Sequence, residues 1–172
     1  FETFYKDKIW GGQKINTILG KDFSPLPYCG ETWEVSDVEG NVSVVKEGSL
    51  QGKTLRELVE QYKDELVGKH VYDQYGNRFP LLIKFIDAND DLSIQVHPDD
   101  ALAAKRNSGF GKTEMWYIMQ ADEGAKLNSG FNREVTKEEY VQAVADNTIQ
   151  DILNIEPAQP GDVFFLPAGR VH

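Results

Sequence analysis

The chain has 172 residues, enough for one domain with a sizeable hydrophobic core. Its net charge of −10 argues against a nucleic-acid partner, because phosphate contacts need clustered lysine and arginine. No apolar run reaches the roughly 18 residues that a membrane-spanning helix needs, and the single cysteine, Cys29, excludes an intrachain disulfide. We therefore expect a protein of a reducing compartment, most simply the cytoplasm, with neither nucleic-acid nor membrane partners.

Short elements of both kinds are predicted along the chain. Alternating or continuous apolar residues predict strands at 32–36, 41–45, 80–87, 91–97, 113–119, 125–131 and 162–166, and the nearly continuous apolar run at 80–87 predicts a core strand. Apolar residues at helical spacing and capping signals predict helices at 54–67, 99–106, 136 to about 147, and 149–155. Thr54 and Thr136 each stand three residues before a glutamate, which is the pattern of a capping box. Many short strands with helices at the edge indicate a domain built on a barrel or sandwich.

A candidate metal site is distributed over three parts of the chain. Ser93, Gln95 and His97 share one face of a predicted strand, because side chains alternate along a strand. Glu114 is a lone carboxylate in an apolar strand, and its burial is costly unless a cation pairs with it. With His172 after a Pro-Ala-Gly turn, these donors predict a divalent metal site. Mixed nitrogen and oxygen ligands favour Zn²⁺, with Mn²⁺, Co²⁺ or Fe²⁺ as alternatives.

Two lysines interrupt the apolar strands. Lys84 lies within the apolar run that begins at Pro80, and Lys112 lies two residues before Glu114, on the same face of a regular strand. A lysine near a metal and a carboxylate suits phosphate binding or acid–base chemistry, since burial lowers its pKa. The alternative for each is a lysine with a buried stem and an ammonium group in solvent.

The last twelve residues have the spacing G-x5-P-x-G-x2-H, which resembles the second signature of the cupin β-barrel. The blocks L-S-I-Q-V-H-P and K-T-E-M-W-Y are more specific, and the chain resembles the type I mannose-6-phosphate isomerases (phosphomannose isomerases), in their shorter bacterial form. The segments that carry this resemblance are 8–12, 30–35, 80–86, 92–98, 112–117 and 161–172. The resemblance therefore runs over essentially the whole chain.

The resemblance implies a mainly β protein with flanking helices, a cupin (jelly-roll) β-barrel. It predicts a single domain over residues 1–172, with a small helical segment at about 136–155. The family carries an arginine and an acidic residue beyond the final metal-ligand histidine. We expect those positions past His172, so that the C-terminal part of the domain is missing from this chain.

The resemblance also implies an enzyme that holds one zinc ion per chain and interconverts mannose 6-phosphate and fructose 6-phosphate. The residues carried over are Gln95, His97, Glu114 and His172 as metal ligands, Lys84 and Lys112 as catalytic and substrate-binding lysines, and Ser93 as a phosphate contact. Aldose–ketose isomerisation moves a proton between C1 and C2 through an enediol or enediolate, and a metal stabilises the negative charge that develops. The expected partner is a small sugar phosphate. The general base, and the choice between monomer and homodimer, stay open.

Two other functions compete with the isomerase. Another cupin enzyme, such as a metal-dependent dioxygenase, usually has H-x-H in its first motif, and Gln95 replaces the first of those histidines. A non-catalytic sugar-binding or regulatory cupin would keep the metal ligands without turnover. An arginine shortly after His172 would favour the enzyme.

Overall fold

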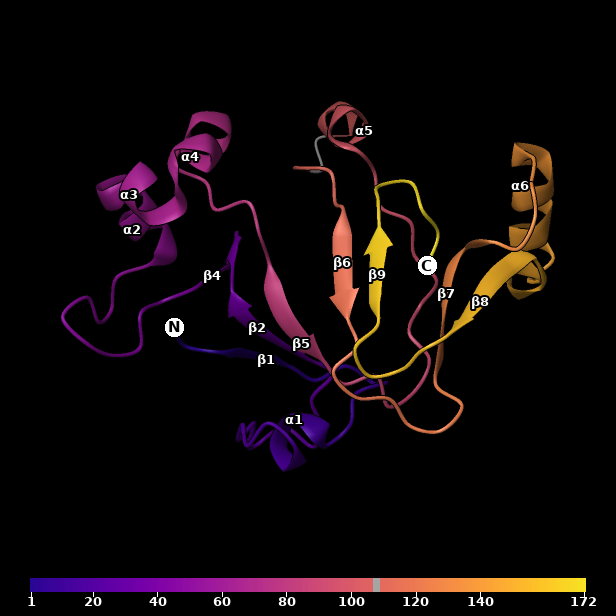
Figure 1. Cartoon of the computed structure of the whole chain (residues 1–172), viewed down its shortest axis with the longest axis horizontal. Coiled ribbons are helices and arrows are strands. Elements are labelled where there is room, and N and C mark those ends of the chain that lie inside the picture. The colour runs from indigo at the N-terminus through magenta and orange to yellow at the C-terminus, as the bar shows by residue number, and fades with distance from the viewer. Residues whose placement is uncertain (107–108) are drawn as a thin grey trace. The chain divides into compact units, whose positions relative to one another are not determined.

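The structure, a computed structural model, describes residues 1–106 and 109–172. The chain divides into two compact units, Phe1–Leu92 and Ser93–His172, so the single domain predicted over 1–172 stays a prediction. The predicted class, short strands with flanking helices, is confirmed (Figure 1). The strands form four separate sheets, and no closed barrel is present in the described part of the chain.

The first unit is built around a three-stranded antiparallel sheet in the order β1-β2-β5. Its elements are β1 (Phe4–Lys6), α1 (Lys14–Thr17), β2 (Glu31–Val35), β3 (Asp37–Val38), β4 (Asn41–Val42), α2 (Leu55–Tyr62), α3 (Asp64–Val67), α4 (Lys69–Tyr75) and β5 (Ile83–Ile86). The strand predicted at 32–36 is β2. The strand predicted at 41–45 is shorter than expected, because β4 ends at Val42 and pairs only with the two residues of β3.

The helix predicted at 54–67 is divided. Thr54 caps α2 with the expected capping box, but Lys63 adopts a φ of +51° and separates α2 from α3. Gly68 (φ +84°) then ends α3 and begins α4. Packing accounts for this division. Helix α2 buries Leu55, Leu58 and Val59, but α3 and α4 bury no residue, so no apolar contact keeps the chain in one continuous helix beyond α2. Among the described helices, none combines the length and the apolar character needed to cross a bilayer.

The core of the first unit lies between α1 and the sheet. Ile15, Phe23 and Cys29 are buried there, and Phe85 of β5 packs against them. The neighbouring residues Ile83 and Ile86 are 47% and 37% exposed, so the prediction of a core strand over 80–87 was wrong about burial on both faces. Ile83 lies on the same face of β5 as Phe85 and Ile86 lies on the opposite face, so both faces of this strand are partly exposed.

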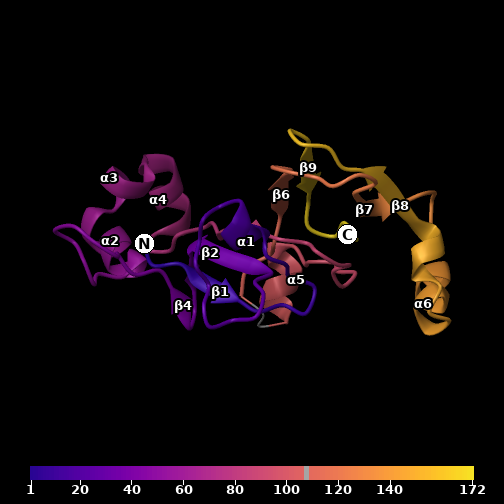
Figure 2. The same ribbon diagram turned by 90° about the horizontal axis from the view of Figure 1, so that it is seen from below.

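The second unit contains two pairs of antiparallel strands, β6–β9 and β7–β8. Its elements are α5 (Asp100–Lys105), β6 (Glu114–Tyr117), β7 (Lys126–Phe131), α6 (Lys137–Ala145), the 3₁₀ helix η1 (Ile149–Ile152), β8 (Leu153–Pro157) and β9 (Val163–Leu166). Helix α6 begins at the predicted capping box of Thr136 and Glu139. Figure 2 shows α6 beside the β7–β8 pair, as Figure 1 does, and an edge-on contact between Phe131 and Tyr140 joins them.

Two predictions in the second unit were wrong. The strand predicted at 91–97 does not form a regular ladder, although Gln95 exchanges backbone hydrogen bonds with His172. The helix predicted at 149–155 is one 3₁₀ turn, after which the chain becomes β8. Pairing with β7 overrides the helical spacing there, because Leu153 is buried opposite Phe131 and Ile155 lies opposite Asn128.

We predict that the half-buried Glu34 makes the stability of the first unit depend on pH. Burial raises the pKa of its carboxyl, but hydrogen bonds from Thr32 (2.7 Å) and Lys21 (3.0 Å), with a weaker one from Thr3, outweigh burial and lower the pKa. A lowered folded pKa adds stability above the unfolded pKa, and that stability is lost as the pH falls through the folded pKa. Glu34→Gln should therefore cost about 1 kcal/mol at neutral pH and much less in acid.

Urea unfolding at neutral and acidic pH measures this difference, with Glu60→Gln on the exposed side of α2 as the matched control. An equal loss for Glu34→Gln at both pH values would contradict the assignment.

Candidate metal centre

Three side chains of the second unit converge with their ligand atoms toward one point. One ligand atom each from His97, Glu114 and His172 lies within 4.8 Å of the other two. Glu114 Oε2 is 3.3 Å from His172 Nε2 and 3.8 Å from His97 Nε2, and the two imidazole centroids are 5.0 Å apart. The structure thus gathers residues that are separated by up to 75 positions in the sequence.

Backbone pairing sets the two histidines side by side. Gln95 N donates to His172 O (2.7 Å), and His172 N donates to Gln95 O (2.9 Å). Gly169 N donates to His97 O (2.8 Å) from a turn in which Gly169 has a φ of +85°, a conformation that glycine adopts without strain. The Pro167–Gly169 turn therefore directs His172 back toward His97, as the spacing of the last twelve residues indicates.

Glu114 begins β6, and the β6–β9 register places it opposite the fully buried Leu166. Its side chain is only 12% exposed, and Oε1 accepts a hydrogen bond from Lys112 Nζ at 2.8 Å. Burial raises the pKa of Glu114, but the hydrogen bond and charge of Lys112, followed by smaller electrostatic contributions from His97 and His172, outweigh burial and hold the pKa below its ordinary value. Glu114 is therefore ionised at neutral pH and available as a ligand.

His172 is oriented by contacts on two sides. Its side chain is 5% exposed, and its Nδ1 lies 2.9 Å from the carbonyl oxygen of Arg170. A carbonyl only accepts, so Nδ1 carries a hydrogen, and Nε2 is the ring atom directed at Glu114. The indole of Trp116 stands edge-on to the ring, with centroids 5.5 Å apart. A histidine held in this way through its other nitrogen has the geometry of a metal ligand.

The ammonium group of Lys112 contacts both His97 and Glu114. Its Nζ is 3.2 Å from His97 Nε2 as well as 2.8 Å from Glu114 Oε1. An ammonium group has no acceptor, so it donates to His97 Nε2, which must present its lone pair. Lys112 N also donates to Pro98 O (3.0 Å), which keeps the lysine beside His97. The ammonium group therefore supplies, in this arrangement, the positive charge that a buried carboxylate requires.

The donor set fits a zinc ion. Tetrahedral Zn²⁺ with ligands at 2.0–2.2 Å has neighbouring ligand atoms about 3.3 Å apart. The 3.3 Å between Glu114 and His172 matches that value, and the 3.8 Å between Glu114 and His97 closes with a small side-chain rotation. Two imidazoles with one carboxylate are donors that zinc prefers.

The other predicted site residues lie in different settings. Gln95 is exposed, and its backbone pairing with His172 places the two side chains on the same face. Ser93 is exposed at the start of the second unit. Their roles as fourth ligand and phosphate contact stay predictions.

Lys84 belongs to the first unit and is bound to a partner that sequence reasoning did not identify. Its Nζ lies 3.4 Å from Glu31 Oε1, and Glu31 Oε2 accepts a hydrogen bond from Trp33 Nε1 (2.8 Å). The register of β2 and β5 pairs Trp33 with Lys84 and so makes Glu31 a diagonal neighbour of Lys84. Knowledge of the register between β2 and β5 would have predicted this ion pair. The alternation of side chains within β5 alone could not, because it does not say which residue of another strand lies alongside. The substrate-binding role of Lys84 stays a prediction.

Comparison with known proteins identifies the family. Residues 1–124 match the family described as phosphomannose isomerase type I, catalytic domain. The mannose-6-phosphate isomerase of Streptococcus mutans is 41% identical over 165 residues, which are 96% of this chain and 50% of that protein. A Bacillus subtilis mannose-6-phosphate isomerase is 37% identical over 177 alignment positions, covering 100% of this chain and 52% of that protein.

A solved structure extends the likeness to three dimensions. The crystal structure of the mannose 6-phosphate isomerase from Bacillus subtilis superposes with a TM-score of 0.87 at 34% identity, over 99% of this chain and 52% of that one. This likeness confirms the predicted cupin fold class. The chain spans about half the length of the curated relatives it matches. With its motifs, its fold and these relatives in agreement, the chain belongs to the type I phosphomannose isomerase family.

Proposed function

We propose that the protein is a zinc-dependent mannose-6-phosphate isomerase, which interconverts mannose 6-phosphate and fructose 6-phosphate. The observation that carries the proposal is the convergence of two imidazoles and an ionised carboxylate, at separations suited to tetrahedral zinc, in a chain of this family. The similar proteins that are named mannose-6-phosphate isomerase support the choice of substrate. We infer one zinc ion per chain, held by His97, Glu114, His172 and Gln95.

The proposed metal site would bind the sugar oxygens and stabilise the charge that develops on them. A bound zinc ion would act as a Lewis acid toward the sugar oxygens at C1 and C2, where negative charge develops in an enediolate. Glu114 offsets part of the charge of the cation, while Gln95 is neutral. The site therefore keeps a net positive charge that suits an oxygen-rich anion.

Lys112 is the residue best placed to handle a proton in the second unit. Its side chain is 43% exposed although its Nζ contacts Glu114 and His97. When His97 Nε2 binds a metal, the ammonium group loses that acceptor, while Glu114 Oε1 can still hold it beside the site, and it becomes available to a sugar oxygen or a phosphate. We infer that Lys112 donates a hydrogen bond or a proton to the substrate there. Lys84 and Ser93 complete the proposed substrate contacts, and we infer a cytoplasmic enzyme.

The proposal is tested by an assay of the full-length protein. Mannose 6-phosphate should be converted to fructose 6-phosphate, activity should disappear after chelation, and added Zn²⁺ should restore it, because the metal stabilises the charge that develops during isomerisation. A coupled assay for fructose 6-phosphate measures the rate. Sugar phosphate binding without turnover at any metal would contradict the enzyme and favour a non-catalytic sugar-binding cupin.

His97→Ala should lower zinc affinity more than about a hundredfold, since removing a direct ligand exceeds the loss typical of its hydrogen-bond partners. Zinc is counted per chain after dialysis, by atomic emission. His70→Ala is the matched control, because His70 is exposed near the start of α4. One zinc per chain in both variants would refute the site.

Lys112→Met should retain zinc but lower kcat about a hundredfold, because the substrate loses its proton or hydrogen-bond donor. Zinc retention should be no weaker than in the wild type, since the lysine competes with the metal for His97 Nε2. Zinc counting and steady-state kinetics separate the two effects. Wild-type kinetics in this variant would leave Lys112 a merely structural partner of Glu114.

A further inference from the structure

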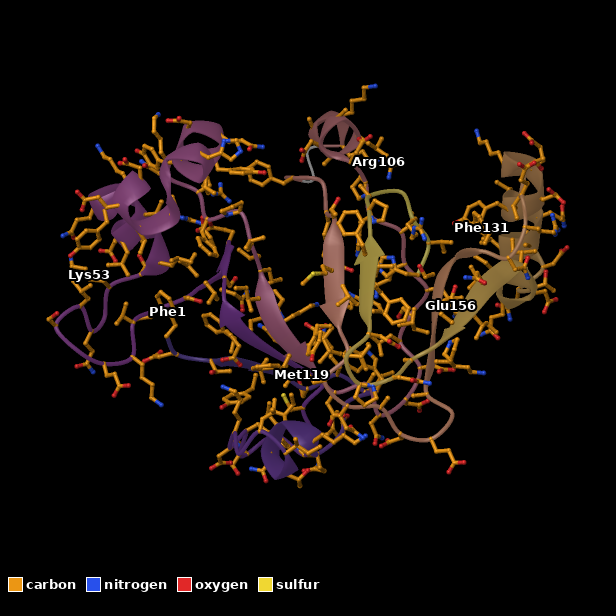
Figure 3. All side chains as sticks on the ribbon, viewed as in Figure 1. Phe1, Lys53, Arg106, Met119, Phe131 and Glu156 are labelled. Carbon is orange, nitrogen blue, oxygen red and sulfur yellow. The ribbon has the colours of Figure 1, made fainter. Side chains whose placement is uncertain are left out.

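A hollow lies in the second unit, between the β7–β8 pair and the turn that precedes His172. It is open to solvent and has a volume of about 490 Å³, within the size range of small-molecule sites. Phe131, labelled at the end of β7 in Figure 3, forms an apolar wall with Pro167 and Val171. Ser129 and Arg170 are among its polar residues. None of its lining residues is a predicted metal ligand.

Arg170 brings an uncompensated positive charge to this hollow. Its guanidinium Nη1 lies 3.4 Å from the hydroxyl of Ser129, and within the described residues no carboxylate is within ion-pair distance of it. By contrast, Arg56, Arg78 and Arg133 each pair with a carboxylate. In a chain of net charge −10, an exposed guanidinium in a hollow creates a local site that favours an anion.

The neighbouring polar groups leave one donor and one acceptor for a ligand. The buried hydroxyl of Ser129 accepts from Arg170, so its own hydrogen remains to be donated. Asn154 Nδ2 donates to Ser129 O (3.3 Å) and to Glu156 Oε1 (2.7 Å), which uses both amide hydrogens. Asn154 Oδ1 is then the atom left to accept. The same bonds hold the Glu156 carboxylate against Asn154.

We propose that this hollow binds the phosphoryl group of a small phosphorylated molecule, independently of the metal centre. The planar guanidinium of Arg170 can bind two phosphoryl oxygens at once, and the Ser129 hydroxyl can bind the third. Asn154 Oδ1 can accept from a hydroxyl of the attached body, which rests on the apolar wall. Gly130 N donates to Val171 O (2.8 Å), so β7 and the Arg170 segment keep the donors together before a ligand arrives.

The test is isothermal titration of metal-free protein with inorganic phosphate and with glycerol 3-phosphate, neither of which is the proposed substrate. Both should bind saturably. Arg170→Met should weaken binding about tenfold or more, and Arg170→Lys should fall between, because lysine keeps the charge but not the two-oxygen contact. Arg133→Met, which removes an arginine paired with Glu139, should bind as the wild type does.

Three results would overturn the proposal: no saturable binding by the wild type, equal affinity in Arg170→Met, or acetate binding as tightly as phosphate. Ser129→Ala provides a second variant, expected to bind several-fold more weakly, and circular dichroism shows that each variant is folded. His97→Ala should leave phosphate binding unchanged. Failure of this site is thereby distinguished from failure of the zinc proposal.

Discussion

The arrangement of the candidate site in the second unit depends on how the negative charge of Glu114 is balanced. A carboxylate at the start of a strand, opposite a fully buried leucine, needs compensation. The structure supplies it with Lys112 at 2.8 Å and with imidazoles at 3.3 and 3.8 Å. These groups hold the pKa of Glu114 below its ordinary value even though burial raises it. The same charge that requires this shell of partners makes the site receptive to a divalent cation.

Backbone hydrogen bonds outside the regular strands position the two histidines beside Glu114. The paired amides and carbonyls of Gln95 and His172 align two segments that carry predicted ligands, and the turn at Gly169 bonds to His97. The Nδ1 of His172 is fixed by a carbonyl of its own segment. Ligands positioned in this way need no rearrangement of the chain to bind a metal, which is the condition for tight and selective binding.

Local signals in the sequence predicted local structure well. The capping boxes at Thr54 and Thr136 mark true helix starts, and the strand around Glu114 forms where alternation predicts it. The predictions that were wrong concern segments whose structure depends on residues far away in the sequence. Lys63 divides a helix that its apolar spacing makes continuous, and residues 153–157 pair with β7 although their spacing is compatible with a helix. The metal-binding residue types were predictable, because motif spacing fixes them, whereas the Lys84–Glu31 pair and the Arg170 hollow depend on strand register and turn geometry.

The proposed function depends on zinc binding by His97, Glu114 and His172. X-ray absorption at the zinc edge of the loaded protein tests it most directly. The spectrum should show about four nitrogen and oxygen neighbours at roughly 2.0–2.1 Å, with the outer-shell scattering of two imidazole rings. His97→Ala, loaded with excess zinc, should reduce the imidazole scattering, because it removes one of the two rings. Six oxygen neighbours without imidazole scattering, or unchanged imidazole scattering in His97→Ala, would contradict zinc binding by these residues.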